Sequence, residues 1–412
     1  MTAPGRRAAG SPDPATLGWV LVALCVSVTA SYGVLYYAFT VLAPAISADT
    51  GWSATQVTTA FSVGSLTGAL AGIWAGRLLQ RRGPRLVMTG GSLLGAVGAA
   101  GVGLAPSYPV FVAAWLLVGI ASAGTFYPPA FAALTQWYGV RRVRAITVLT
   151  LVAGFASTIF APLTAALGEG LGWRDTYLVF AGLLLAITVP AHAFALRLPW
   201  HSGDDGAHVR PDREVLTSRP FLLLAASGTL ASLAMYASIV HLVPLLLALG
   251  VDLQLAAWAL GLSGAGQVAG RLVYPALDRR TGPNARAAGT TALMGLTLAG
   301  LALAPGPVVL LIAIAVVSGA ARGLFTLVGA TIVSDHWGPQ RYAALNGVFQ
   351  APMGVAGALA PAFGAGVAAA TGSYAALFGV LAVLALVGAA LVPLAGRPAD
   401  VRAAAGRPDE HA

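Results

Sequence analysis

The chain has 412 residues, of which 58% are hydrophobic and only 9% are charged, with a formal net charge of +9. Soluble globular proteins carry roughly 25% charged residues, so this composition excludes a soluble enzyme, a secreted domain and a disordered chain. Continuous apolar runs of about 20 residues match the length that a helix needs to cross a bilayer. They also exclude a β-barrel, whose strands alternate apolar and polar residues. The expected fold class is therefore an all-α integral membrane protein.

Clusters of glycine, proline and arginine divide the apolar sequence into twelve runs, which we predict to be transmembrane helices. Their approximate ranges are 17–43, 55–76, 86–105, 109–134, 145–168, 175–196, 220–248, 253–277, 287–305, 308–333, 343–369 and 373–395. The first run is longer than the 7–15-residue apolar core of a signal peptide, so we expect it to be retained. An even number of passes places both termini on the same side of the membrane.

The arginines predict the orientation of the chain, which contains no lysine. The tails and loops form two alternating sets, of which one contains 20 arginines and the other contains only Arg174. Because cytoplasmic loops are enriched in lysine and arginine, we predict that the first set and both termini are cytoplasmic. The positive charge then faces the membrane surface and does not indicate nucleic-acid binding. We expect a multi-pass protein of the plasma (inner) membrane.

The longest polar stretch lies near the middle of the chain and separates two similar halves. We predict a cytoplasmic tail (1–16), a six-helix bundle (17–197), a cytoplasmic loop (198–219), a second six-helix bundle (220–396) and a cytoplasmic tail (397–412). Four features recur at offsets of 198 to 200 residues: Arg81-Arg82-Gly83-Pro84 as Arg279-Arg280-Thr281-Gly282-Pro283, Tyr138-Gly139 as Trp337-Gly338, Ala161-Pro162 as Ala360-Pro361, and Pro44 as Pro244. A parallel repeat of this kind places a cavity between two bundles near the membrane midplane.

The second predicted helix carries glycines at four-residue intervals, at Gly64, Gly68, Gly72 and Gly76. This spacing places all four on one helix face, where it predicts close packing against another helix. A smooth glycine face would also allow the two helices to slide or rock past each other.

Only two formal charges, Arg271 and Arg322, lie deep within predicted helices, and no Asp or Glu accompanies them there. Arginine does not deprotonate in proteins, and a charge at the membrane centre costs at least ~2.5–3.5 kcal/mol. An anionic substrate is the simplest partner, because a bidentate guanidinium–carboxylate pair has the strongest geometry. Two alternatives remain open: an ion pair between Arg271 and Asp278, about two turns away, and hydrogen bonds from Arg322 to neighbouring helix carbonyls.

Two uncharged polar residues are further candidates for the same site. Gln267 lies one turn before Arg271 and faces the same side of its helix, so it could hydrogen-bond a substrate. His241 belongs to a residue type that titrates near neutrality, so it could carry a proton. A hydrogen-bonded interface histidine is the alternative interpretation of His241.

Three tyrosines, Tyr36, Tyr37 and Tyr127, are candidates for the wall of the cavity. A tyrosine offers an apolar ring and one hydroxyl group. Adjacent residues on a helix point about 100° apart, so at most one of Tyr36 and Tyr37 faces the cavity directly. Packing in the protein core is an equally good interpretation of all three.

The loop after the second predicted helix carries a family signature. Its sequence Gly76-Arg77-Leu78-Leu79-Gln80-Arg81-Arg82-Gly83-Pro84-Arg85 resembles the Gly-x-x-x-Asp-Arg-x-Gly-Arg-Arg motif of the major facilitator superfamily, with Gln80 in place of Asp and Pro84 in place of Arg. The second half keeps Asp278-Arg279 but has Tyr274 in place of Gly. The resemblance implies two six-helix bundles and a conformational or gating role for Gly76, Arg81, Gly83, Asp278 and Arg279.

Further segments resemble the monocarboxylate porters and oxalate–formate antiporters of this superfamily. They are Thr50–Ser62, His241–Gly250, Gly270-Arg271 and Arg341–Gly347. The resemblance implies that Arg271 holds the substrate carboxylate and that Tyr36, Tyr37 and Tyr127 lie on helices that line the cavity. In many of these porters an Asp four residues before the Arg takes part in proton coupling. Gln267 occupies that position here, so coupling through the usual acid is not expected.

The expected function is secondary active transport of a small organic anion, with a monocarboxylate as the first candidate, by alternating access. Proton symport through His241 and exchange of one anion for another are both candidate drivers. The alternative is a proton-coupled exporter of a hydrophobic metabolite or drug on the same fold. The sequence contains no phosphate-binding loop and no Cys/His metal spacing, and its helices hold too few polar groups for an enzyme. We therefore expect no cofactor, no metal, and a monomer whose partners are the anion, protons and membrane lipid.

Overall fold

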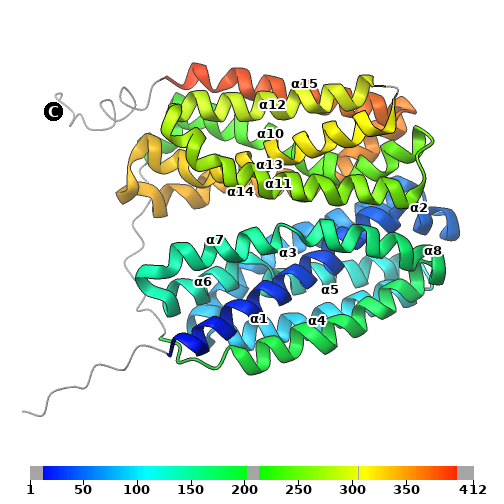
Figure 1. Cartoon of the computed structure of the whole chain (residues 1–412), viewed down its shortest axis with the longest axis horizontal. Helices are drawn as coiled ribbons and strands as arrows, with labels where there is room; N and C mark the ends of the chain where they lie inside the picture. Colours follow the sequence, from blue (N-terminus) through cyan, green and yellow to red (C-terminus); the bar gives the residue numbers. More distant parts are fainter. Residues whose placement is uncertain (1–12, 202–212, 305, 397–412) are drawn as a thin grey trace, which may run out of the picture.

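The computed structural model describes residues 13–201, 213–304 and 306–396, and within these ranges the chain is folded into helices joined by short turns (Figure 1). The predicted all-helical membrane fold is thereby confirmed. The predicted tail 397–412, most of the tail 1–16 and the centre of the loop 198–219 lie outside the described residues. The part of that loop that is described includes one short helix, α9 (Arg213–Thr217).

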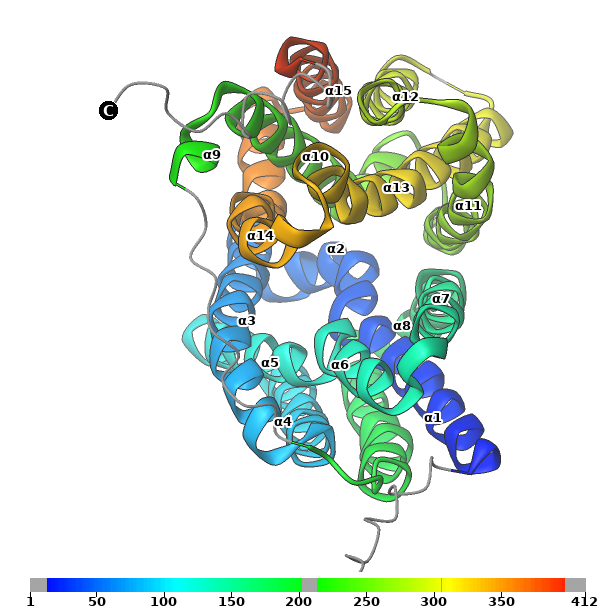
Figure 2. The same ribbon diagram turned by 90° about the vertical axis from the view of Figure 1, so that its left-hand side faces the viewer.

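The first half of the chain forms one group of helices. These are α1 (Pro14–Tyr32), the π-helical turn η1 (Gly33–Tyr37), α2 (Ala38–Thr50), α3 (Ala54–Arg82), α4 (Pro84–Leu104), α5 (Tyr108–Thr125), α6 (Tyr127–Tyr138), the 3-10 turn η2 (Gly139–Arg141), α7 (Arg142–Ala153), α8 (Ala156–Leu183) and the π-helical turns η3 (Leu184–Thr188) and η4 (Ala191–Ala195). In Figures 1 and 2 this group lies below the helices of the second half. We call it the first bundle.

The second bundle contains the remaining long helices. These are α10 (Arg219–Ala248), α11 (Leu253–Arg280), α12 (Pro283–Leu303), α13 (Val308–Trp337), α14 (Pro339–Thr371), α15 (Tyr374–Leu391) and the 3-10 turn η5 (Pro393–Ala395). Figure 2 shows α14 of this bundle beside α3, and α11 beside α7.

Nine helical stretches in the described part of the chain are long and apolar enough to cross a membrane. One of them, Tyr108–Ala195, is 88 residues long. The turn at Gly139–Arg141, where Gly139 has φ +52°, and the kink at Gly172, with φ +80°, divide this stretch into three passes. The helix α11 is not among the nine; it contains two glutamines and several glycines in its first eighteen residues, and an acid and three arginines in its last ten. With α11 included, the helices accommodate all twelve predicted passes.

Two predicted passes are less regular than their sequence suggests. The predicted helix 109–134 is interrupted at Phe126, which has an extended conformation (φ −83°, ψ −164°). Pro128 and Pro129 follow in the first turn of α6, where proline is accepted because the first N–H groups of a helix have no partner within it. The predicted helix 145–168 is interrupted between Ala153 and Ala156, where α7 ends and α8 begins.

Glycine allows pairs of helices to approach closely in both bundles. In the first bundle, Cβ atoms placed on Gly68 and Gly119 would overlap the backbone of the opposite helix, since α3 and α5 meet there. In the second bundle, Gly319 of α13 faces the Ser263 carbonyl of α11 in the same manner. The prediction of close packing is correct for Gly64 and Gly68, whereas Gly72 and Gly76 face open space.

We expect Gly319→Ala to lower the thermal stability of the purified protein. The added methyl group would overlap the Ser263 carbonyl, and overpacking of this kind typically costs about 1–3 kcal/mol. Gly289→Ala in α12 is the matched control, because a Cβ at Gly289 meets nothing within 4 Å. Thermal unfolding in detergent would compare the two variants, and an equal midpoint for both would contradict this view of the α11–α13 contact.

The two bundles are in close contact at the end opposite the termini, which we call the closed end (Figure 1). Residues of one bundle are buried in the hydrophobic core of the other: Val41, Ala161 and Ala165 in that of the second, and Val240 in that of the first. Hydrogen bonds that cross between the bundles at this end include those from Thr158 Oγ1 to the Gly261 carbonyl (2.7 Å), from the Ala362 N–H to Ser62 Oγ (3.0 Å) and from Gln254 Nε2 to the Pro162 carbonyl (3.4 Å).

Candidate functional site

Five tyrosines from both bundles gather between the closed end and the termini. They are Tyr32, Tyr36 and Tyr37 of α1 and η1, Tyr127 of α6, and Tyr236 of α10; we call them the tyrosine layer. The ring centroids of Tyr32 and Tyr127 are 5.0 Å apart, and those of Tyr36 and Tyr37 are 5.3 Å apart. Tyr36 packs against the cores of both bundles. The layer therefore lies at the junction of the bundles, and η1 is of the π-helical type that is frequent at functional sites.

Arg271 of α11 lies beside this layer and is half buried. Its Nη1 atom donates a hydrogen bond to the Thr150 carbonyl of α7, 2.7 Å away, and this bond links the two bundles. The guanidinium also interacts with the phenol of Tyr127 and electrostatically with Tyr32. The alternative ion pair with Asp278 is wrong, because the Asp278 carboxylate instead pairs with Arg286, 2.6 Å away.

Arg322 of α13 is more deeply buried, with only 4% of its surface exposed. Its Nη2 atom donates to Ser263 Oγ at 3.2 Å, and its Nε atom has no hydrogen-bond partner among the described residues. Tyr36 and Tyr37 interact electrostatically with its guanidinium. The alternative prediction of bonds to helix carbonyls is wrong in the described part of the chain, where its acceptor is a serine hydroxyl.

The two guanidinium groups share one electrostatic environment, in which no described residue supplies a matching anion. Arg271 and Arg322 interact electrostatically with each other, and Tyr236 interacts with both. Other arginines do pair with acids, Arg174 with Asp49 and Arg286 with Asp278 and Asp335, but neither Arg271 nor Arg322 forms an ion pair with a described residue. A buried cation without a counter-ion is costly, so this region is a strong candidate for binding a negatively charged ligand.

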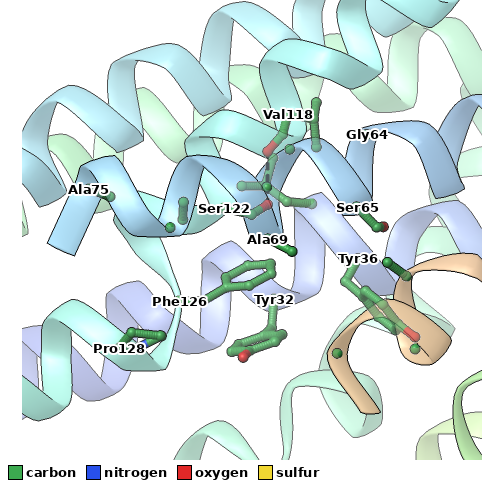
Figure 3. A pocket seen from close by; sticks show the side chains of 18 of the residues that line it. Tyr32, Tyr36, Gly64, Ser65, Ala69, Ala75, Val118, Ser122, Phe126 and Pro128 are labelled. Carbon is green, nitrogen blue, oxygen red and sulfur yellow. Dashed lines mark hydrogen bonds between the residues drawn. The ribbon is translucent and has the colours of Figure 1, made fainter. Parts of the chain in front are cut away.

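A cavity of about 620 Å³ adjoins the tyrosine layer (Figure 3). Tyr32, Tyr36 and Tyr236 form part of its wall, and most of the remainder comes from α3, α5, α6 and α14. Figure 3 shows the Tyr32 ring stacked on Phe126, with a centroid separation of 3.9 Å. Along α3 the lining runs from Phe61 to Leu79, about 27 Å of helix. The cavity therefore extends from the tyrosine layer toward the termini.

The other predicted substrate contacts lie outside the lining of this cavity. Tyr37, Tyr127, Arg271 and Arg322 belong to the adjoining cluster described above. Gln267 is half buried one turn from Arg271, and its backbone carbonyl faces Gly323 of α13. The structure thus brings the predicted arginines and tyrosines together, with the tyrosine layer between the guanidinium groups and the cavity.

His241 occupies a different environment from the arginines. It is buried, its Nε2–H donates to the Pro361 carbonyl at 2.9 Å, and its Nδ1 atom has no partner among the described residues. The ring lies against Gly364 of α14 and 5.9 Å from the Tyr374 ring of α15. These contacts are internal to the second bundle and fit the alternative of a hydrogen-bonded interface histidine. A proton-carrying role stays a prediction.

Sequence reasoning missed Tyr32 and Tyr236, although the sequence contains a signal for each. Tyr32 lies four residues before Tyr36 and hence one helical turn away on the same face. Tyr236 lies 200 residues after Tyr36, which is the offset that relates Pro44 to Pro244. Tyr36 and Tyr236 therefore occupy equivalent positions in the two halves of the repeat, and both line the cavity.

The signature loops have different structures in the two halves. In the second half the Arg286 guanidinium, 4% exposed, pairs with both Asp278 and Asp335, at 2.6 and 2.9 Å. Gln80 and Gln136 stand at the corresponding positions of the first half, so this ion-pair network is confined to the second half of the described chain.

The other residues of the signature loops lie in the last turns of α3 and α11 or directly beside them. Gly83, with φ +78°, ends α3 and precedes α4, and its Cα faces the Trp200 ring. Gly76 lines the cavity, and Arg81 and Arg279 are exposed in the last turns of α3 and α11. A gating role for these residues stays a prediction.

Known proteins resemble this chain over most of its length. Residues 24–314 match the family described as Major Facilitator Superfamily. The chain is 28% identical to monocarboxylate transporter 13 of Rattus norvegicus over 397 residues, covering 92% of this chain and 89% of that relative. It is 30% identical to the chloramphenicol resistance protein of Streptomyces lividans over 314 residues (72% and 75%). It is 25% identical to the oxalate:formate antiporter of Oxalobacter formigenes over 198 residues (48% and 46%).

The fold is also that of a solved structure. A bacterial homologue of the human lysosomal transporter Spinster, in an inward-facing and unoccupied conformation, superposes with a TM-score of 0.75 at 17% identity, covering 93% of this chain and 98% of that one.

Proposed function

Because the chain belongs to the Major Facilitator Superfamily, as its signature loops predicted, we propose that it is a secondary active transporter of a small organic anion, with monocarboxylates as the first class to test. The resemblance to monocarboxylate porters and to the oxalate:formate antiporter is confirmed at low identity. The same findings make the chain a multi-pass membrane protein. The substrate class is our inference from the site.

One observation supports the proposal most strongly: two neighbouring arginines, Arg271 and Arg322, have no acidic partner among the residues that the structure describes. Arg286 shows how this chain stabilises a buried arginine when the role is structural, because two aspartates pair with it. Among the described residues, Arg271 donates to a carbonyl, Arg322 donates to a serine hydroxyl, and both interact electrostatically with tyrosines. A carboxylate ligand would supply the missing charge and charge-assisted hydrogen bonds.

Alternating access is the mechanism that this arrangement favours. The cavity extends from the tyrosine layer toward the termini, and the contacts between bundles close the other end. Rocking of the bundles about the layer would open the closed end and expose the same arginines to the other side. We infer that the termini are cytoplasmic, because the arginine-rich loops lie at their end, so the described conformation would be inward-facing.

A second candidate function is export of a hydrophobic metabolite or drug. The largely apolar lining of the cavity favours it, as does the 30% identity to a chloramphenicol resistance protein. The two functions differ in their need for a negative charge on the substrate. Competition by simple carboxylates would support the anion transporter, and resistance to uncharged drugs without such competition would support the exporter.

The test is radiolabel uptake into proteoliposomes across a panel of small carboxylates. We expect saturable uptake of at least one monocarboxylate, with mutual competition between related acids. Imposing a pH gradient, or preloading the vesicles with unlabelled anion, separates proton symport from exchange. No uptake of any carboxylate in either format, with correctly folded protein, would overturn the proposal.

A further inference from the structure

We propose that the preferred anion carries a sizeable apolar group, aromatic or aliphatic, that occupies the 620 Å³ cavity while its carboxylate binds on the arginine side of the tyrosine layer. This inference rests on the proposed function and narrows the substrate class. It concerns a part of the site that a two- or three-carbon acid would leave empty.

The wall of the cavity offers little to a small hydrated anion. Apart from Tyr32, Tyr36 and Tyr236, its large side chains are apolar, and they include Leu35, Phe61, Ile73, Trp115, Val118 and Phe126. None of its lining residues is charged. The hydroxyl of Ser122 is already engaged, since it donates to the Val118 carbonyl at 2.8 Å. Contact with this wall is therefore favourable mainly for hydrocarbon surface.

The width of the cavity comes from small residues on α3. Ala69, Gly72, Ala75 and Gly76 face it, and Cβ atoms built on Gly72 and Gly76 meet nothing within 4 Å. The volume of about 620 Å³ falls in the range of roughly 300–1,000 Å³ that is typical for pockets of drug-sized ligands. An aromatic ring or a chain of several methylenes would fit this space.

One wall of the otherwise largely apolar cavity is polar, because the tyrosine layer and the arginines behind it lie there. Tyr36 and Tyr236 line it and also interact electrostatically with Arg322. The Tyr36 hydroxyl is buried without a hydrogen-bond partner among the described residues, as is the Nε atom of Arg322. An amphiphilic anion fits both features at once, because its charged end would satisfy these donors and its apolar body would lie along α3.

A homologous series of acids tests the proposal directly. We expect the apparent affinity, measured by competition against a transported acid, to rise about 3- to 4-fold for each added methylene from acetate to hexanoate. 3-Phenylpropanoate should compete at least tenfold better than propionate. Affinity that is flat or falls beyond three carbons would overturn the inference and leave the proposed anion transport intact. Failure of every carboxylate to bind would overturn the proposed function itself.

A cavity-filling variant tests where the apolar group binds. The measured quantity is the ratio of the binding constants of 3-phenylpropanoate and propionate in detergent, which does not require a complete transport cycle. Gly72→Leu would fill the open space and is expected to lower this ratio at least tenfold. Ala69→Leu, from the adjacent turn of α3, serves as a second variant if Gly72→Leu does not fold.

Gly289→Leu is the matched control, because Gly289, like Gly72, is a helical glycine whose added Cβ meets nothing within 4 Å, but it does not line the cavity. It should leave the ratio unchanged. An unchanged ratio in both α3 variants, or an equal fall in the control, would overturn the assignment of the apolar group to this cavity.

Discussion

Replacing Arg271 with glutamine is expected to reduce the transport of organic anions by about 100-fold. The substitution removes the charge while leaving a polar side chain that can still reach toward the Thr150 carbonyl. Charge-assisted hydrogen bonds contribute about 1.5–3 kcal/mol each, so loss of the two bonds of a bidentate carboxylate pair corresponds to at least about two orders of magnitude in affinity. Arg271→Lys is expected to retain little activity, because an ammonium group cannot reproduce the planar bidentate geometry.

Initial uptake rates in proteoliposomes at equal protein content are the measurement for Arg271. Arg174→Gln is a suitable control, because Arg174 donates to carbonyls as Arg271 does, but it pairs with an acid and lies at the closed end. Its ion pair with Asp49 is long, at 3.6 Å, and about half exposed, so it contributes little and transport should stay within about twofold of the parent. Full activity of both Arg271 variants would exclude this residue from the site.

Arg322→Leu is expected to abolish substrate-dependent stabilisation and yet to raise the stability of the ligand-free protein. Arg322 is almost completely buried and has no acidic partner among the described residues. Replacing a buried ionic group by a hydrophobic side chain of similar volume is often neutral or stabilising by about 1–4 kcal/mol. The same change removes a cation that we propose to interact with the substrate.

Arg286→Leu is the comparison variant, and it is expected to lower the stability of the ligand-free protein, whereas Arg322→Leu is expected to raise it. Arg286 has the same exposed fraction as Arg322, 4%, but it pairs with Asp278 and Asp335. Removing one partner of a buried ion pair typically costs about 3–5 kcal/mol, and the partial exposure of both aspartates lowers the expected cost here. Thermal unfolding in detergent, with and without a competing carboxylate, would measure both variants. Destabilisation by Arg322→Leu in the absence of ligand would show that this cation is structural.

The contrast between these two arginines illustrates what charge counting along a chain can and cannot predict. The sequence shows that the second bundle has two arginines deep within helices and no acid at the same depth, and this excess is a property of the chain alone. It does not show which arginine the available acids reach. Asp278 lies seven residues from Arg271 on the same helix, yet its carboxylate pairs with Arg286 on the next helix. The choice depends on side-chain direction and on how α11 packs beside α12.

The glycines of α3 likewise show which part of a contact the sequence predicts and which part it does not. Their four-residue spacing correctly predicts a common face, because the helical period alone determines it. The face passes from close contact with α5 at Gly64 and Gly68 to open cavity at Gly72 and Gly76. The change reflects the divergence of the helices along their length, which local periodicity does not encode.

The sequence by itself predicts the all-helical membrane fold, the internal repeat and the candidate anion site at Arg271. Each follows from a property that can be read along the chain: the length of the apolar runs, the constant residue offset between the halves, and the absence of acids near the deep arginines. The tertiary structure alone decided that Tyr32 and Tyr236 complete the tyrosine layer, that His241 faces α14 and α15, and that an apolar cavity adjoins the arginines. These features depend on which faces of distant helices meet, and that is determined by the packing of the two bundles as a whole.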